Sequence, residues 1–163
     1  MKSLQQHISE KLVINKNFDV YNEFPKNSDE LYDIVEQRIK ENTEEPYLSD
    51  IDTSKIDDMS ALFAGEDVVK VDLSNWDVSN VKDMGSMFSV CKKLEYVDLT
   101  GWKTTSLENM LSMFWKCKNL KEIKGIKDFD ITLLKDSDYF KSDEDDTFLD
   151  VPEELIPSWW HEY

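Results

Sequence analysis

The sequence predicts an α/β protein: a short solenoid of about three strand–helix repeats, with a helical cap at the N-terminus and a further cap at the C-terminus. One observation is a phrase that occurs three times, as IDDMSALF at 56–63, VKDMGSMF at 81–88 and LENMLSMF at 107–114. Another is the strand-like apolar alternation that follows each copy. Regular repetition at this spacing is typical of stacked repeats, because one short unit cannot bury its own apolar face.

Residues 1–50 are expected to form the N-terminal helical cap. A capping-box signal begins a first helix whose apolar face would carry Leu4, Ile8 and Leu12. Either Asn27 or Ser28 can cap a second helix. The buried stripe of that helix would be Leu31, Ile34, Val35 and Ile39. We interpret both helices as a cover for the first repeat, the alternative being a separate binding device.

Residues 51–129 are expected to hold the repeats. In each copy of the phrase the apolar residues fall at i, i+3, i+6 and i+7, which is one face of about two helical turns. The strand that follows alternates, so Val71 and Leu73 would face the core while Asp72 faces away. Trp76 and Trp102 recur with the repeat and are therefore predicted to form a buried ladder.

The segment VDLSNWDVSNVKDMGSMFSVCKKLEYVDL at 71–99 resembles the repeat of the BspA-like leucine-rich repeat family, which reads roughly DLSxWDxSNVxxMxxMFxxCxxLxxL. With ELYDIVEQRIKE and LSDIDTSKIDDMSALF upstream, the resemblance covers about residues 28–126. It implies a solenoid of the leucine-rich-repeat type. The family includes bacterial and protozoan surface proteins and many proteins of gut bacteria and phages, so the resemblance implies neither catalytic residues nor a single function.

We predict that the protein is not an enzyme and holds no cofactor or metal. Glycine occurs at four scattered positions and never in a phosphate-binding cluster. Cys91 and Cys117 occupy matching repeat positions and are interpreted as reduced, buried thiols, with a disulfide between neighbouring repeats as the alternative. His7 and His161 lie at opposite ends of the chain and do not make a zinc-ligand spacing with the cysteines.

The charge balance is strongly acidic, with 35 acidic against 19 basic residues and a net charge of −16. This disfavours a nucleic-acid ligand, because phosphates are themselves anionic. Solubility explains an acidic surface most simply, and the alternative is attraction of a basic protein partner by imitation of nucleic-acid phosphates. Because neither a signal peptide nor a membrane span is indicated, we expect a single domain, residues 1–163, in the cytoplasm.

Residues 130–163 form an acidic, aromatic C-terminal segment. The run DEDD at 143–146 is interpreted as a solvated loop, since it lacks the alternation and the central glycine of a calcium loop. Trp159 and Trp160 belong to an apolar end that is predicted to cap the third repeat. The alternative is a docking motif or an oligomer contact, because Trp and Tyr are common anchors of interfaces.

Two surfaces are candidate partner-binding sites. The exposed face of the strands would display Asp72, Tyr96, Asp98 and Lys124. The second is Trp115, a large aromatic outside the repeating set, which is equally well interpreted as a core filler or as an exposed anchor. We therefore predict a non-catalytic protein–protein interaction module. The main alternative is an acidic inhibitor from a phage or mobile element that sequesters a basic nucleic-acid-binding protein, and the second is a fragment of a surface adhesin.

Overall fold

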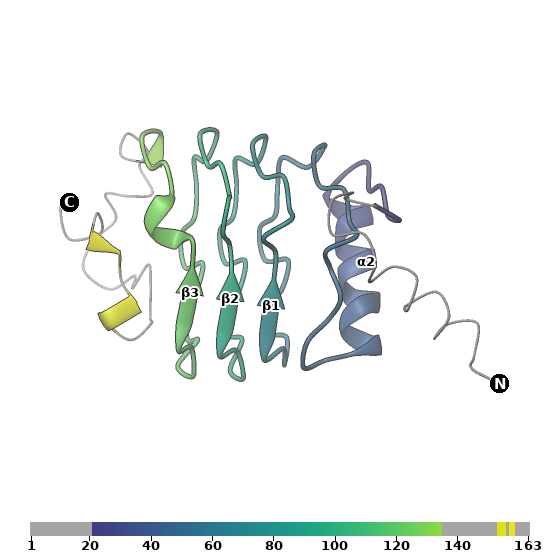
Figure 1. Ribbon diagram of the computed structural model, residues 1–163, viewed down its shortest axis with the longest axis horizontal. Coiled ribbons are helices and arrows are strands. Elements are labelled where there is room, and N and C mark those ends of the chain that lie inside the picture. The colour runs from purple at the N-terminus through teal and green to yellow at the C-terminus, as the bar shows by residue number, and fades with distance from the viewer. Residues whose placement is uncertain (1–20, 135–152, 156, 159–163) are drawn as a thin grey trace, which may run out of the picture.

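The computed structural model describes residues 21–134, 153–155 and 157–158. The elements in chain order are α2 (Ser28–Glu41), β1 (Lys70–Asp72), β2 (Tyr96–Asp98), β3 (Glu122–Lys124) and the 3₁₀ helices η1 (Ile126–Asp128) and η4 (Glu153–Leu155). Figure 1 shows the three strands side by side, with α2 at the end of the row next to β1. Among these described residues, no helix has the length and apolar character needed to cross a bilayer.

The strands form an open, three-stranded parallel sheet in the order β1-β2-β3. Val71 pairs with Val97, and Val97 with Ile123, so each strand is displaced by one repeat from the last. In every strand the central residue is buried and its two neighbours point outward, as the alternation predicts. The spacing of the repeat therefore fixes the register of the sheet.

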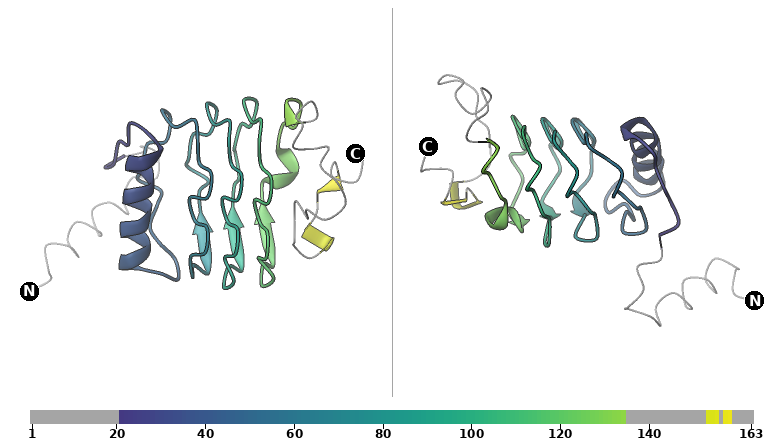
Figure 2. Two further views of the ribbon diagram at one scale, coloured as in Figure 1. Left: turned by 180° about the vertical axis from the view of Figure 1, so that it is seen from behind. Right: turned by 90° about the horizontal axis from the view of Figure 1, so that it is seen from above.

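The predicted solenoid of strand–helix repeats is wrong, because the phrases at 56–63, 81–88 and 107–114 are not helices. Their residues adopt turns and isolated parallel bridges, which pair Asp58 with Asp83 and Asp83 with Asn109. Within the described residues the single α-helix is α2, which precedes all three copies, and the sheet is small and open. Both views in Figure 2 show no helical ribbon between β1 and β2 or between β2 and β3, where helices were expected.

The hydrogen bonds of the phrase explain this correction. Alternate N–H groups bond across to the next copy, as when Met59 N donates to Asp83 O at 2.8 Å and Phe63 N to Met87 O at 2.8 Å. The N–H groups between them bond within the copy: Leu62 N donates to Met59 O, three residues back, and Ser60 N donates to Asp58 Oδ1, two residues back. Ala61 also has a positive φ of 55°, which interrupts any α-helix. The apolar spacing thus arises from successive tight turns.

The core is built from rows of equivalent side chains. Phe88 stacks on Phe63 and Phe114 on Phe88, with ring centroids 5.0 and 5.2 Å apart. Such aromatic pairs contribute about 1 kcal/mol each beyond their buried area. The predicted burial of the two repeating tryptophans is confirmed: Trp76 and Trp102 are buried, and their indole N–H groups donate to backbone carbonyls at 3.0 and 2.8 Å.

Both cysteines are free and buried, as the interpretation of reduced thiols predicts. Each thiol donates a hydrogen bond to a backbone carbonyl of the preceding repeat, Cys91 to Phe63 and Cys117 to Phe88, both at 2.9 Å. The neighbouring Cys117 thiol, together with burial, holds the pKa of Cys91 above its ordinary value. Cys91 and Cys117 are therefore structural, weakly reactive groups.

Helix α2 forms where the second N-terminal helix was predicted, and Asn27 is its N-cap. The Asn27 side chain accepts a hydrogen bond from Glu30 N at 2.9 Å. The residues that face the core are Leu31, Val35 and Ile39, with Ile34 partly buried against it. At the start of the helix, Ser28 Oγ donates to Asp58 O in the first phrase. The first predicted helix, with Leu4, Ile8 and Leu12, lies outside the described residues.

The predicted C-terminal cap falls largely outside the described residues. Phe129, Ile131 and Leu134 extend the core beyond β3 and are buried. Leu155 in η4 packs against the same core and is partly buried. The acidic run at 143–146 is not described, nor are the tryptophans that follow it.

Candidate functional site

The candidate site is the exposed face of the sheet. Two rows of side chains run across the strands: Lys70, Tyr96 and Glu122 in the first, and Asp72, Asp98 and Lys124 in the second. Because the strands pair in register, each residue of a row lies directly beside its equivalent, about 4.8 Å away across the sheet. Four of the residues predicted to bind a partner, Asp72, Tyr96, Asp98 and Lys124, are thereby brought onto one face.

Asp72 and Asp98 also fix the turn that follows their strand. Asp72 Oδ1 accepts hydrogen bonds from Ser74 N at 3.0 Å and from Ser74 Oγ at 2.7 Å. Asp98 Oδ1 accepts from Thr100 N at 3.0 Å in the same way. Such bonds from a residue two positions on close a turn, which is a frequent role of aspartate. One oxygen of each carboxylate is therefore committed to the fold.

Tyr96, Asp98 and Lys124 form a connected cluster at the centre of the face. The Tyr96 hydroxyl donates to Asp98 Oδ2 at 2.9 Å. The Lys124 ammonium lies 3.7 Å from the same oxygen and 5.1 Å from the centre of the Tyr96 ring. The three side chains come from β2 and β3, and the contacts orient the tyrosine ring on a partly exposed surface. Asp72 sits beside the cluster on β1.

The electrostatics of the cluster favour its charged form. Partial burial raises the pKa of Asp98, but the hydrogen bonds from Thr100 and Tyr96 and the nearby Lys124 charge outweigh it, so the pKa lies below the usual value. The interaction with Tyr96 raises the pKa of Lys124. Lys124 lowers the pKa of Tyr96, but burial and Asp98 raise it further, to a net value above the ordinary one. At neutral pH Asp98 and Lys124 are an ion pair and Tyr96 is protonated.

Two shallow hollows border the face on its β1 side. One, of about 340 Å³, is lined by residues 45–49 together with Asp72, and the other, of about 150 Å³, by Asn42, Glu44, Glu45, Val69 and Lys70. Tyr47 lies in the first hollow and is 62 % exposed. The sequence reasoning missed Tyr47, because the first copy of the repeat was traced only from its phrase at 56–63. The signal that could have found it is the match of LSDIDTS at 48–54 to LSNWDVS at 73–79, which places Tyr47 in register with Asp72.

The remaining predicted residues are not on this face. Trp115 lies in the turn between the third phrase and β3 and is partly buried. The Lys116 ammonium lies 3.7 Å from the centre of its ring. The structure therefore separates Trp115 from the cluster around Tyr96. Trp159 and Trp160 lie outside the described residues.

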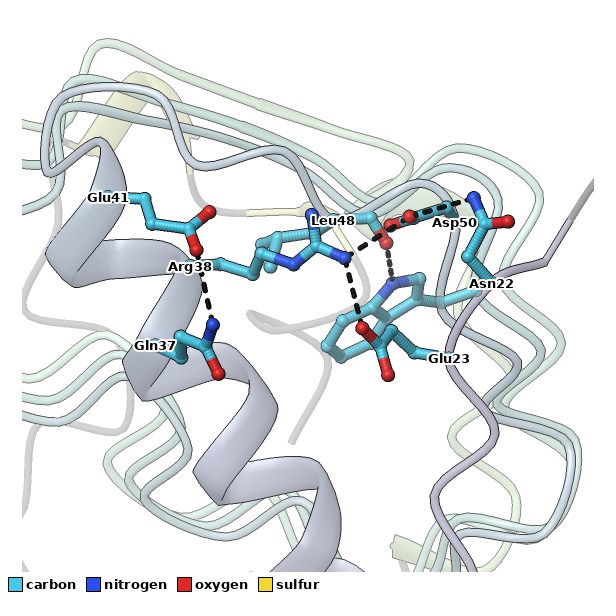
Figure 3. A network of polar contacts seen from close by, with 8 residues as sticks. Asn22, Glu23, Gln37, Arg38, Glu41, Leu48 and Asp50 are labelled. Atoms are coloured by element: carbon cyan, nitrogen blue, oxygen red, sulfur yellow. Dashed lines mark hydrogen bonds and ion pairs between the residues drawn. The ribbon is translucent and has the colours of Figure 1, made fainter. Parts of the chain in front are cut away.

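A second polar network joins α2 to the segments that precede and follow it, and Figure 3 shows its members. The Arg38 guanidinium contacts Asp50 at 3.2 Å and Glu23 at 3.4 Å. Asn22 donates to the same Asp50 oxygen at 3.2 Å, while Asp50 Oδ1, which is buried, has no hydrogen-bond partner among the described residues. Because Asp50 is almost inaccessible, we interpret this network as a tie between segments and not as a binding face.

Comparison with known proteins places the chain in a family. A family model described as "Mycoplasma protein of unknown function, DUF285" matches residues 30–147, which is more than two thirds of the chain. The match includes α2 except for its first two residues, all three phrases and the whole sheet. No curated protein matches the chain, and no solved structure matches it.

Proposed function

We propose that this chain, which belongs to the DUF285 family of Mycoplasma proteins of unknown function, is a non-catalytic module that binds another protein through the exposed face of its sheet. We further propose that the repeat phrase of this chain and the repeat of the BspA-like proteins, which it resembles, have a common origin. The binding face is defined as Lys70, Asp72, Tyr96, Asp98, Glu122 and Lys124 with the adjoining Tyr47.

The observation that carries the proposal is the cluster of Tyr96, Asp98 and Lys124. A tyrosine held by a hydrogen bond and an adjacent ammonium loses little conformational freedom when a partner covers it. Tyrosine is also among the residues that contribute most to protein interfaces. The bordering hollows are shallow and of about 150 and 340 Å³, at or below the usual size of small-molecule sites. This geometry suits side chains of a protein partner.

Acidity favours a partner with a basic surface. The chain carries a net charge of −16, which accelerates encounters with basic proteins at low ionic strength. The same charge favours a second candidate, an inhibitor that sequesters a basic nucleic-acid-binding protein by imitating phosphates. The two candidates differ in what holds the complex together: an apolar anchor on the face in the first, and long-range charge in the second.

The experiment is a capture of partners from a host lysate at low and at high salt, followed by affinity measurement with the purified partner. We expect Tyr96→Ala to weaken binding by about tenfold or more, as truncation of an interface tyrosine does. Tyr32→Ala is the matched control, because Tyr32 is an exposed tyrosine of α2, away from the face. Tyr96→Phe separates the role of the hydroxyl from that of the ring.

Three results would count against the face. If the Tyr96→Ala and Tyr32→Ala variants bind the partner with equal affinity, Tyr96 is not the central anchor of the interface. Loss of every partner at moderate salt, together with displacement of the partner by DNA or RNA, would favour phosphate imitation instead. If the partner stays bound at high salt and binds the Tyr96→Ala and Tyr47→Ala variants as tightly as the parent protein, the interface lies elsewhere on the protein.

A further inference from the structure

Positive charge gathers at one edge of this acidic protein. The turns that lead into β2 and β3 carry Lys92, Lys93, Lys116, Lys118 and Lys121, which we call the lysine edge. The stretches 84–94 and 110–121, from which these lysines come, contain no Asp or Glu. The two turns lie side by side, because Val90 N donates to Trp115 O at 2.7 Å and Asn119 Nδ2 donates to Lys92 O at 2.7 Å.

Only part of this charge is neutralised by ion pairs. Lys93 pairs with Asp67 at 2.8 Å, and Lys121 with Glu95 at 2.7 Å, each across one repeat. The exposed ammonium groups of Lys92, Lys116 and Lys118, in contrast, make no ion pair with any carboxylate of the described residues.

Lys92 and Lys118 also occupy equivalent positions in neighbouring repeats. Tyr96 and Glu122, four residues after each of them, are register partners in the sheet, and Asn119 Nδ2 donates to Lys92 O, so the two turns lie side by side. Like charges on adjacent turns repel each other. A carboxylate placed between the two ammonium groups would relieve this repulsion and form two ion pairs at once.

An aromatic side chain completes the edge. Trp115 lies in the same turn as Lys116 and Lys118, is partly buried, and presents one face of its indole to the Lys116 ammonium at 3.7 Å. The preceding copy of the phrase has a buried Ser89 at the matching position, so the tryptophan belongs to the third turn alone. A partly covered tryptophan among cations is a common anchor for a peptide side chain.

We propose that the lysine edge binds a short acidic segment of a partner protein, with one carboxylate between Lys92 and Lys118 and a neighbouring side chain against Trp115. The limited number of free ammonium groups suits a segment with two or three carboxylates. A nucleic acid is a poorer fit, because it needs many phosphate contacts, and the net charge of −16 repels the rest of a long polyanion. This surface shares no residue with the face around Tyr96.

The test uses a short fluorescein-labelled oligoglutamate peptide and fluorescence anisotropy at low ionic strength. The double variant Lys92→Glu/Lys118→Glu should bind the peptide at least about tenfold more weakly than the parent protein. The matched control is Lys55→Glu/Lys82→Glu, which makes the same change in net charge at exposed lysines near the first two phrases. We expect it to weaken binding less than about threefold, through the overall field alone. Trp115→Ala should weaken binding without any change in charge.

Circular dichroism and urea unfolding establish that each variant is folded, and the altered lysines make no ion pair among the described residues. Equal losses in the two double variants would overturn the proposal. Tighter binding of an oligothymidine probe than of the peptide, lost in the edge variant, would replace it with a nucleic-acid site. Concentration-dependent association in sedimentation, lost in the edge variant, would replace it with an interface between copies of this chain. None of these results depends on Tyr96, so the lysine edge and the binding face around Tyr96 are tested independently.

Discussion

Replacement of Gly125 by alanine tests how closely the repeats approach one another. Gly125 follows β3 and has a φ of +83°, in the region that side chains rarely adopt. A Cβ atom there would lie 2.6 Å from the carbonyl carbon of Leu99 and 2.7 Å from Thr100 N. Both are backbone atoms of the preceding repeat, so no flexible side chain can move aside. Gly125→Ala must therefore displace the chain that follows β2 or β3.

The expected cost has two parts. An alanine in the left-handed region costs about 1 kcal/mol relative to glycine, and overlap with a fixed backbone adds about 1–3 kcal/mol. We therefore expect Gly125→Ala to lower the free energy of unfolding by about 3 kcal/mol. Gly65→Ala is a matched control, because Gly65 has a φ of +79° but a Cβ atom added to it would meet no atom within 4 Å. It should cost only the conformational part, about 1 kcal/mol.

The measurement is urea unfolding, followed by tryptophan fluorescence and by circular dichroism, with the free energy extrapolated to zero urea. We expect the two glycine variants to differ by about 2 kcal/mol, with similar slopes. If Gly65→Ala and Gly125→Ala lose the same free energy, the close approach of Gly125 to the preceding repeat is refuted. A destabilisation that is larger for Gly65→Ala would refute it more strongly.

Three further predictions concern the thiols, the face and the helix. Cys91 and Cys117 should react with a thiol reagent only after unfolding, because burial and the raised pKa of Cys91 leave little thiolate in the native state; the measurement is the rate of thiol modification with and without urea. Asp98→Asn should lower stability at neutral pH, and this loss should vanish as the pH falls below the lowered pKa of Asp98, since the carboxylate is then protonated in both the folded and the unfolded parent protein; urea unfolding at several pH values measures it. Asn27→Ala should lower the free energy of unfolding by about 1 kcal/mol through loss of the N-cap of α2.

Each of these has a contrary result. If the thiols of the folded protein are modified as fast as those of the unfolded protein, they are accessible in the native state. A stability difference between the parent and Asp98→Asn that persists unchanged at low pH would mean that the carboxylate charge is not its cause. The control for the helix is Asn75→Ala, at an exposed turn. If Asn27→Ala and Asn75→Ala both have the free energy of unfolding of the parent protein, the N-cap contributes nothing to stability.

The sheet and the arrangement of its face follow from the sequence because they depend only on period and alternation. Once Val71 and Val97 are matched, Tyr96, Asp98 and Lys124 must lie together, and the structure confirms that they do. The same reasoning wrongly predicted a helix for the phrase between the strands. Its apolar spacing reports which side chains face the core, but not whether N–H groups bond within a helix or to the next copy. Tyr47 was missed because the match of LSDIDTS at 48–54 to LSNWDVS at 73–79 was not extended to the residue before it, which is equivalent to Asp72.

The turn aspartates change the interpretation of the acidity. In seven places within the part of the chain that the structure describes, an aspartate side chain accepts a hydrogen bond from the backbone N–H two residues on, namely at Asp52, Asp58, Asp72, Asp77, Asp83, Asp98 and Asp130. These carboxylates close the corners of successive repeats, so their abundance has a structural cause that is independent of any partner. For Asp77, the hydrogen bonds from Ser79 lower the pKa, which is the sign expected of a carboxylate that stabilises the fold as an anion.

A test of phosphate imitation by charge removal must therefore avoid the turn aspartates, because their loss would weaken binding by unfolding the protein. Asp33, Glu108 and Asp128 are exposed, lie outside the binding face, and make no ion pair or side-chain hydrogen bond among the described residues that would confound the result. Replacement of all three by the corresponding amides should leave the free energy of unfolding nearly unchanged. If binding to a basic partner then falls steeply while Tyr96→Ala has no effect, long-range charge and not the tyrosine cluster holds the complex together.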